Sequence, residues 1–235
     1  MKQIPMIFNT EMVKALLDGR KTVTRRPIQI PDGWELHDRV LSKITSSHPK
    51  KGKWGALIRK GVNTDFPQSD LIPAPCFVGD LLYVRETFAT LHSGDYQEIS
   101  PWETSCQEVR YKASEPQALA YESDHEIRGY KWRPSIHMPK HCSRLTLKVI
   151  DVRIERVQEI TEQQAVAEGM PTDEECQQSA IKAGLGWYQR PAIWFKNTWD
   201  RIYSNWSQNP YTWVIEFEVI HSNVSKVASQ TDKAA

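Results

Sequence analysis

The chain has 235 residues with 30 Lys and Arg against 29 Asp and Glu, so its net charge of +1 gives no whole-molecule field that would attract a polyanion. Hydrophobic residues make up 40% and charged residues 25%, which is typical of a globular protein and argues against extended disorder. The first residues lack the apolar segment of a signal peptide, and no stretch approaches the length of a membrane span. A cytoplasmic protein without a membrane partner is expected.

Residue types that bind metals show no ligand pattern. The four cysteines are far apart and include no C-x-x-C pair: Cys76, Cys106, Cys142 and Cys176. We expect reduced, mostly buried thiols. His137 and His141 are four positions apart, but Pro139 between them breaks the helix that would bring them together. The sequence therefore predicts neither a metal site nor a cofactor.

Charge is unevenly distributed at the start of the chain. Between Glu11 and Lys60 there are 12 Lys and Arg against 5 Asp and Glu, and Trp34 and Trp54 lie among them. Such a face can meet nucleic-acid phosphates, or it can be an ordinary solvated surface. Both interpretations stay open on the sequence.

In the first part of the chain, Thr10 is predicted to cap a helix over residues 11–18, which Gly19 ends. Residues 21–26, KTVTRR, alternate as a strand up to Pro27. Residues 28–78 are polar and proline-rich and predict a long, partly ordered insertion. Strands are expected over 79–88, around EVRYKA, and over 143–157, where a change of alternation at Ile150 and Asp151 indicates a bulge.

The second part contains clear helix and strand signals. Thr161 and Gln164 form a capping box for a helix that ends at Gly169, which places Glu168 in its last turn. Pro191 suits the first position of a helix over the following dozen residues. Residues 211–220 alternate as a closing strand with one apolar face. Residues 221–235 are small and polar and are expected to form a flexible tail.

The segment DGRKTVTRR, residues 18–26, gathers most of the reactive side chains. A lysine partly buried among cations tends to lose its charge and can act as a base, and a threonine hydroxyl needs such a base to become a nucleophile. Lys21, in the turn before the strand, and Thr24 can form this pair. Alternatively, Thr24 is an ordinary strand residue and the cations contact phosphate or solvent.

The segment LLDGRKTVTRR resembles the G-x-K signature of the ASCH family, and GDLLYV, TEQQAVAEGM and WVIEF follow in the order that the family shows. This resemblance implies an α+β fold, a PUA-like β-barrel with flanking helices. It implies a single domain over residues 1–220, with insertions at about 28–78 and 90–142.

The same resemblance suggests an activity. Many family members have glutamate where this chain has Thr24, whereas the threonine is similar to small bacterial members that remove the acetyl group from N4-acetylcytidine. Their lysine, threonine and glutamate correspond to Lys21, Thr24 and Glu168, and Arg26 matches the arginine of the signature. Lys21 would activate Thr24 for attack on the amide, and Glu168 would protonate the departing amine or guide water, without a metal.

The chain also departs from those small enzymes, because it is about twice as long. WRPSIHMPK, within residues 131–142, and the whole layout resemble longer ASCH proteins of phages and prophages. Arg133 and His137 in this segment are candidates for lining or covering the pocket.

Three functional hypotheses follow. The first is an amidohydrolase acting on an N4-acylated cytidine or a related modified nucleoside. The second is a non-catalytic PUA-like module that binds RNA, in which Arg20, Lys21, Arg25 and Arg26 hold phosphates. The third, a protein of phage assembly, rests on no particular residue, and the sequence does not indicate an oligomeric state.

Overall fold

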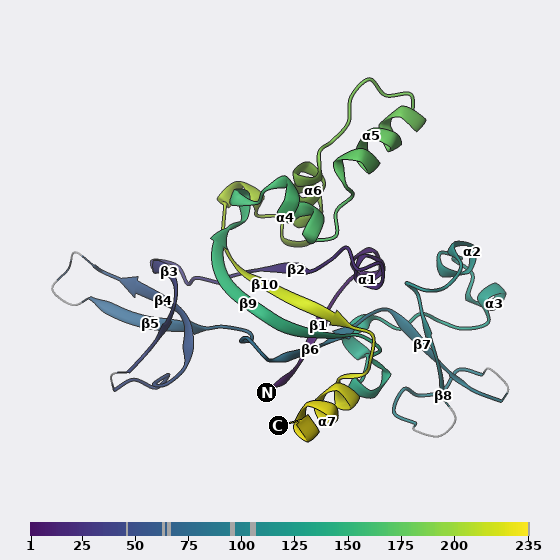
Figure 1. The fold of residues 1–235 in the computed structure, drawn as a ribbon, viewed down its shortest axis with the longest axis horizontal. Coiled ribbons are helices and arrows are strands. Elements are labelled where there is room, and N and C mark those ends of the chain that lie inside the picture. Colours follow the sequence, from purple (N-terminus) through teal and green to yellow (C-terminus); the bar gives the residue numbers. More distant parts are fainter. Residues whose placement is uncertain (46, 63, 65–66, 95–96, 104–106, 235) are drawn as a thin grey trace. The chain divides into compact units, whose positions relative to one another are not determined.

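A computed structural model of the chain describes residues 1–45, 47–62, 64, 67–94, 97–103 and 107–234 and has a mixed α+β fold (Figure 1). The α+β class expected from the sequence is therefore confirmed. The chain groups into two compact units. The first unit comprises Met1–Lys21, Gly79–Lys148 and Glu218–Ala235, and the second comprises Thr22–Val78 and Val149–Phe217. Cys106 lies outside the described residues.

The strands form three sheets. Their orders are β1-β6-β9-β10-β2, β3-β4-β5 and β7-β8. No closed barrel is found among the described strands, so the expected barrel is not confirmed. None of the helices within the described ranges has the length and apolar character needed to cross a bilayer.

The first unit is built on the pairing of its first strand. β1 (Gln3–Ile7) runs parallel to β6 (Leu81–Arg85), and the two longest strands, β9 (Thr146–Arg156) and β10 (Tyr211–Ile220), continue from one unit into the other. The remaining elements of the first unit are α1 (Thr10–Leu17), β7 (Phe88–His92), β8 (Gln107–Tyr111), α2 (Gln117–Ala120), α3 (His125–Arg128), the 3-10 helices Ser135–His137 and Lys140–Cys142, and α7 (Val224–Ala234). The strand expected around EVRYKA is thus confirmed as β8.

The cap of α1 differs by one residue from the prediction. Asn9 has extended backbone angles, and its side-chain oxygen accepts a hydrogen bond of 2.8 Å from the backbone N–H of Met12. Asparagine is at least as good a cap as threonine, so the helix begins one residue earlier and Thr10 is its first helical residue.

The C-terminal segment forms α7 instead of the expected flexible tail. Val224, Val227 and Ala228 lie on one face of this helix and pack with Leu81 in a buried cluster. Most helical stability comes from packing an apolar face and not from intrinsic propensity. Three small apolar side chains at helical spacing are therefore enough to order the segment once β6 provides a surface.

The second unit contains β2 (Val23–Pro27), which pairs antiparallel with β10 so that Thr24 lies opposite Ile215. β10 is more buried than its alternation predicts, because Thr212 and Val214 are fully buried as well as the expected apolar face. β9 shows the expected change of alternation, with residues 147 and 149 buried before Ile150 and residues 152 and 154 buried after Asp151.

The described residues between 28 and 78 contain more strand structure than expected. They contain a three-stranded antiparallel sheet of β3 (Glu35–Lys43), β4 (Trp54–Lys60) and β5 (Gln68–Pro73), with Ala56, Ile58 and Leu71 buried. A Cβ atom at Gly55 would overlap the carbonyl oxygen of Ile72, so this position admits only glycine at the observed strand spacing. Alternation on each strand is interrupted, which hid the sheet from the sequence.

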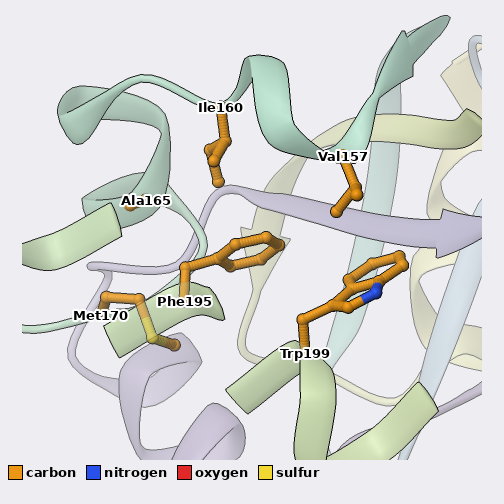
Figure 2. Close-up of a cluster of buried hydrophobic side chains, with 6 residues drawn as sticks. All are labelled: Val157, Ile160, Ala165, Met170, Phe195 and Trp199. Carbon is orange, nitrogen blue, oxygen red and sulfur yellow. The ribbon is translucent and has the colours of Figure 1, made fainter. Parts of the chain in front are cut away.

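Helices α4 (Glu162–Ala167), α5 (Asp173–Lys182) and α6 (Pro191–Tyr203) belong to the second unit, with the 3-10 helices Val157–Glu159 and Trp206–Gln208. The capping box of Thr161 and Gln164 is confirmed, as is Pro191 at the start of α6. In Figure 2, Phe195 and Trp199 of α6 point toward Val157 and Ile160, and Ala165 and Met170 complete this buried cluster. The cluster holds the end of α4 against α6.

We predict that Val227→Ala lowers the free energy of unfolding by about 1–3 kcal/mol, because it leaves a gap beside Leu81. Urea denaturation measures this change. Lys226→Ala is the matched control on the exposed face of α7 and should have little effect. Equal midpoints for the two variants would contradict the packing of α7.

Candidate functional site

Lys21 is the last residue of the first unit's N-terminal segment and lies in the turn after α1, as the sequence predicts. Its backbone N–H donates to the carbonyl of Ala15 at 3.0 Å, and Gly19 in this turn has a positive φ of 72°. The side chain is fully buried, with Nζ 5.8 Å from the centroid of the Phe8 ring. A lysine so removed from water is uncommon in a folded protein and marks the turn as a candidate site.

Thr24 is buried in β2, with 2% of its surface exposed. β2 is the last strand in the order of its sheet, and a backbone hydrogen bond of 2.9 Å joins Thr22 N to the carbonyl of Ala167 at the end of α4. This contact links residues 18–26, the junction motif between α1 and β2, to a segment that lies far away in sequence. Consequently, Glu168, the residue after Ala167, lies beside the edge of β2.

Glu168 is the C-terminal cap of α4 and is also 2% exposed. Its Oε1 is 3.2 Å from Nη1 of Arg25, whose side chain is fully buried. Arg25 and Thr24 are neighbours on a strand, so their side chains leave it on opposite faces. The carboxylate is therefore held by the arginine that follows Thr24.

Arg25 has a second acidic partner. Its Nη2 lies 2.9 Å from Oε2 of Glu155, which belongs to β9, so the arginine side chain reaches across β10. The guanidinium carbon is 5.9 Å from the centroid of the Phe195 ring, part of the cluster in Figure 2. Arg25 is thus fixed on two sides by carboxylates and is not available to hold a phosphate in this arrangement.

The network continues through Arg153. This side chain donates to Glu155 at 2.6 Å and to Asp151 at 2.8 Å, and it also contacts Glu216. Burial raises the pKa of Glu155, but the hydrogen bond from Arg153 and the charge of Arg25 outweigh burial, so the pKa is lowered from its ordinary value. Burial lowers the pKa of Arg153, but its hydrogen bonds to Glu155, Asp151 and Glu216 outweigh burial, so the pKa is raised above its ordinary value.

A pocket of about 300 Å³ opens beside this network. Its lining consists of Thr22, Val23, Ile150, Arg153, Gln163, Gln164, Ala167 and Glu216. The pocket therefore borders the residues next to Thr24 and Glu168 in sequence and is large enough for a nucleobase. It combines apolar walls with a few polar groups, as small-molecule sites commonly do.

The remaining predicted binding residues are dispersed. Arg20 pairs with Asp18 at 3.2 Å on the surface, and Arg26 donates to the hydroxyl of Tyr203 at 3.2 Å. Arg133 donates to the carbonyl of Ile99 at 3.2 Å, and His137 is exposed at the end of its 3-10 helix. Arg133 and His137 both belong to the first unit. The side chain of Arg133 thus contacts a main-chain carbonyl.

Within the described residues, no group of three or more His, Cys, Asp or Glu side chains is arranged to hold a metal ion. His137 ends the 3-10 helix Ser135–His137, and His141 lies in the next one, Lys140–Cys142, with Pro139 between the two helices. Cys76, Cys142 and Cys176 are buried, and burial raises the pKa of the Cys142 thiol to about 11. Burial also raises the pKa of the Cys176 thiol, so neither of these two groups has the lowered pKa of a reactive cysteine.

The network of Arg25, Glu155, Arg153 and Glu216 was not predicted from the sequence. A signal is present, because Asp151, Arg153 and Glu155 alternate along one strand and therefore share a face. Their connection to Arg25 depends on the order β9-β10-β2, which the sequence does not reveal.

Comparisons with known proteins found no family model, no curated protein and no solved structure that matches this chain.

We predict that Glu155→Gln reduces stability at about pH 7 by roughly 1–2 kcal/mol and flattens the loss of stability in acid. A carboxylate whose pKa is lowered by folding stabilises the protein above its ordinary value of 4.5 and loses this contribution as pH falls through the lowered value. Urea unfolding at a series of pH values from neutral to acid measures the effect. Glu218→Gln, on the exposed face of β10, is the control and should retain the parent profile.

Proposed function

We propose that the protein is a metal-independent amidohydrolase of the ASCH type, with a PUA-like fold, that deacylates an N4-acylated cytidine or a related modified nucleoside. Lys21, Thr24 and Glu168 are its catalytic residues. The observation that carries the proposal is the hydrogen bond between Thr22 N and the carbonyl of Ala167, which brings the end of α4 to the junction motif. Glu168 directly follows Ala167, and Thr24 is two residues after Thr22, so this hydrogen bond supports a site at the start of β2.

Burial supports the same choice. Lys21, Thr24 and Glu168 are exposed by 0%, 2% and 2%, respectively, and are among the few polar side chains buried in the described part of the chain. Polar groups are rarely buried without a structural or chemical role, and catalysis uses all three types.

The chemistry proceeds in two steps. Lys21 takes the proton from the Thr24 hydroxyl, Oγ1 attacks the amide carbonyl, and the C–N bond breaks as the lysine returns the proton to the departing exocyclic amine. Water then attacks the acyl-threonine ester as Glu168 accepts a proton from that water. The bond between the acyl carbon and Oγ1 breaks, Glu168 returns the proton to Oγ1 of Thr24, and the carboxylic acid leaves. The ion pair with Arg25 holds the Glu168 carboxylate.

The alternative is a non-catalytic module that binds RNA. It requires Arg20, Lys21, Arg25 and Arg26 to face phosphates. Arg25 instead has a fully buried side chain shared by two carboxylates, and Lys21 is buried beside Phe8. Only Arg20 and Arg26 remain partly exposed, so the geometry favours the enzyme.

We predict that the purified protein converts N4-acetylcytidine into cytidine and acetate, measured by chromatography of the nucleosides. Thr24→Ala removes the nucleophile, and Lys21→Ala removes the base, so each should lower kcat by at least about 10²–10⁴-fold. Thr24→Ser retains a hydroxyl and should retain part of the activity.

The matched control is Thr45→Ala, an exposed threonine of the second unit that does not line the pocket. This variant should keep kcat within a few-fold, and circular dichroism and thermal unfolding should show all variants folded. If the parent protein releases no cytidine from a series of N4-acylcytidines, the enzymatic proposal is wrong. RNA affinity that falls steeply with salt and is weakened by Arg20→Ala and Arg26→Ala would then support the binding module.

A further inference from the structure

We infer that Arg25 is a positioning residue for Glu168, and that Glu155 and Arg153 hold Arg25 in its working orientation. This inference rests on the proposed function, because it assigns a task to groups that support the proposed catalytic carboxylate. Neither the junction motif nor the resemblance to the ASCH family gives Arg25 this role.

The geometry of Arg25 carries the first step. Its two terminal nitrogens are divided between two carboxylates, with Nη1 3.2 Å from Glu168 and Nη2 2.9 Å from Glu155. A planar guanidinium fixes the directions of its donors, so contact with one carboxylate determines where the other can lie. Glu155 on β9 therefore sets the direction in which Arg25 presents Nη1 to the end of α4.

The surroundings of Arg25 also restrict the movement of its side chain. Its side chain is fully buried, and the Phe195 ring lies 5.9 Å from the guanidinium carbon. Figure 2 shows that Phe195 is itself packed among Val157, Ile160 and Met170. A charge held in an apolar setting keeps its partners because no water can replace them.

Arg153 extends this support to the pocket. It binds Glu155 through the oxygen that Arg25 does not use, Oε1 at 2.6 Å against Oε2 at 2.9 Å. Each oxygen of Glu155 thus has its own arginine. Arg153 also lines the 300 Å³ pocket with Glu216. A ligand that displaces Arg153 from Glu155 would loosen Arg25 and, through it, Glu168.

A simple structural ion pair would give a different result from a positioning residue. Loss of a structural pair lowers stability and reduces the amount of active protein, but the folded molecules retain their turnover. Loss of a positioning residue misdirects Glu168 in molecules that remain folded, so kcat falls while KM changes little. The two interpretations therefore separate in the kinetics of folded variants.

The experiment compares Arg25→Lys and Glu155→Gln with the parent protein, using N4-acetylcytidine well below the unfolding temperature of each variant. Lysine keeps the charge but has a single nitrogen, which cannot bridge two carboxylates in fixed directions. We expect Arg25→Lys to lower kcat by about 10- to 100-fold with KM within about threefold. Glu155→Gln should also lower kcat, but by a smaller factor. If Arg25→Lys does not fold, Glu155→Gln alone tests the inference.

The matched control is Arg39→Lys. Arg39 also donates to a carboxylate, that of Glu159 at 2.8 Å, but on the surface of the second unit. This variant changes an arginine-carboxylate pair in the same way and should leave kcat unchanged. A loss of kcat in Arg39→Lys equal to that in Arg25→Lys would overturn the inference.

A second readout does not depend on turnover. In protein labelled with 13C at glutamate carboxyl carbons, the Glu168 signal is identified by its loss in Glu168→Gln. We expect this signal to move in Arg25→Lys and in Glu155→Gln, and to stay in place in Arg39→Lys. An unmoved signal in both network variants would overturn the inference even if turnover falls.

The outcomes distinguish the inference from the proposed function. If the parent protein deacylates the nucleoside and the folded network variants keep their kcat, Arg25 is not a positioning residue, and the enzyme assignment stands. If the parent protein has no activity on N4-acylcytidines, the proposed function fails, and the carboxyl signal alone decides whether Arg25 and Glu155 orient Glu168.

Discussion

The cost of burying charge governs the second unit. Two arginines and four carboxylates meet where β9, β10, β2 and the end of α4 converge, and the side chain of Arg25 in their midst is completely buried. Removal of one member of such a buried pair typically costs about 3–5 kcal/mol, because the remaining charge has neither water nor partner. The network therefore does little to increase stability over an apolar core, but it penalises any arrangement that separates Arg25 from its carboxylates. The main effect of the network is to fix the orientation of Arg25 and its carboxylates at the edge of β2.

The hydrophobic cluster and the charged network are complementary. Phe195 and Trp199 pack α6 against the end of α4, and their rings in Figure 2 turn toward Val157 and Ile160. This packing fixes the backbone at Ala167, whose carbonyl accepts from Thr22. Apolar contacts thus determine where the α4 terminus lies, and polar contacts determine how the carboxylate after it is directed. A site with catalytic requirements needs both, because a tolerance of about 1 Å separates productive from unproductive geometry.

Local signals in the sequence were sufficient for much of this arrangement. The capping box at Thr161, the proline at 191 and the strict alternation over 211–220 act within a few residues, and each predicted its element correctly. The turn that contains Lys21, the strand that contains Thr24 and the helix end at Glu168 were likewise predicted from local signals. The errors share another cause: α7 is ordered by Leu81, a partner far away in sequence, and the β3-β4-β5 sheet has interrupted alternation. Likewise, Arg25 and Glu155 are connected only by the strand order, which no local pattern encodes.

The shared guanidinium also constrains how this protein can change over evolution. A mutation that neutralised Glu168 alone would leave one side of the buried Arg25 guanidinium without its carboxylate. A mutation that replaced Arg25 alone would leave Glu155 and Glu168 without the cation that they share. Single steps away from this arrangement therefore lower stability, whatever happens to activity. Descendants that abandon the carboxylate after α4 are expected to have lost the arginine of β2 in the same lineage, so the two positions should be inherited as a unit.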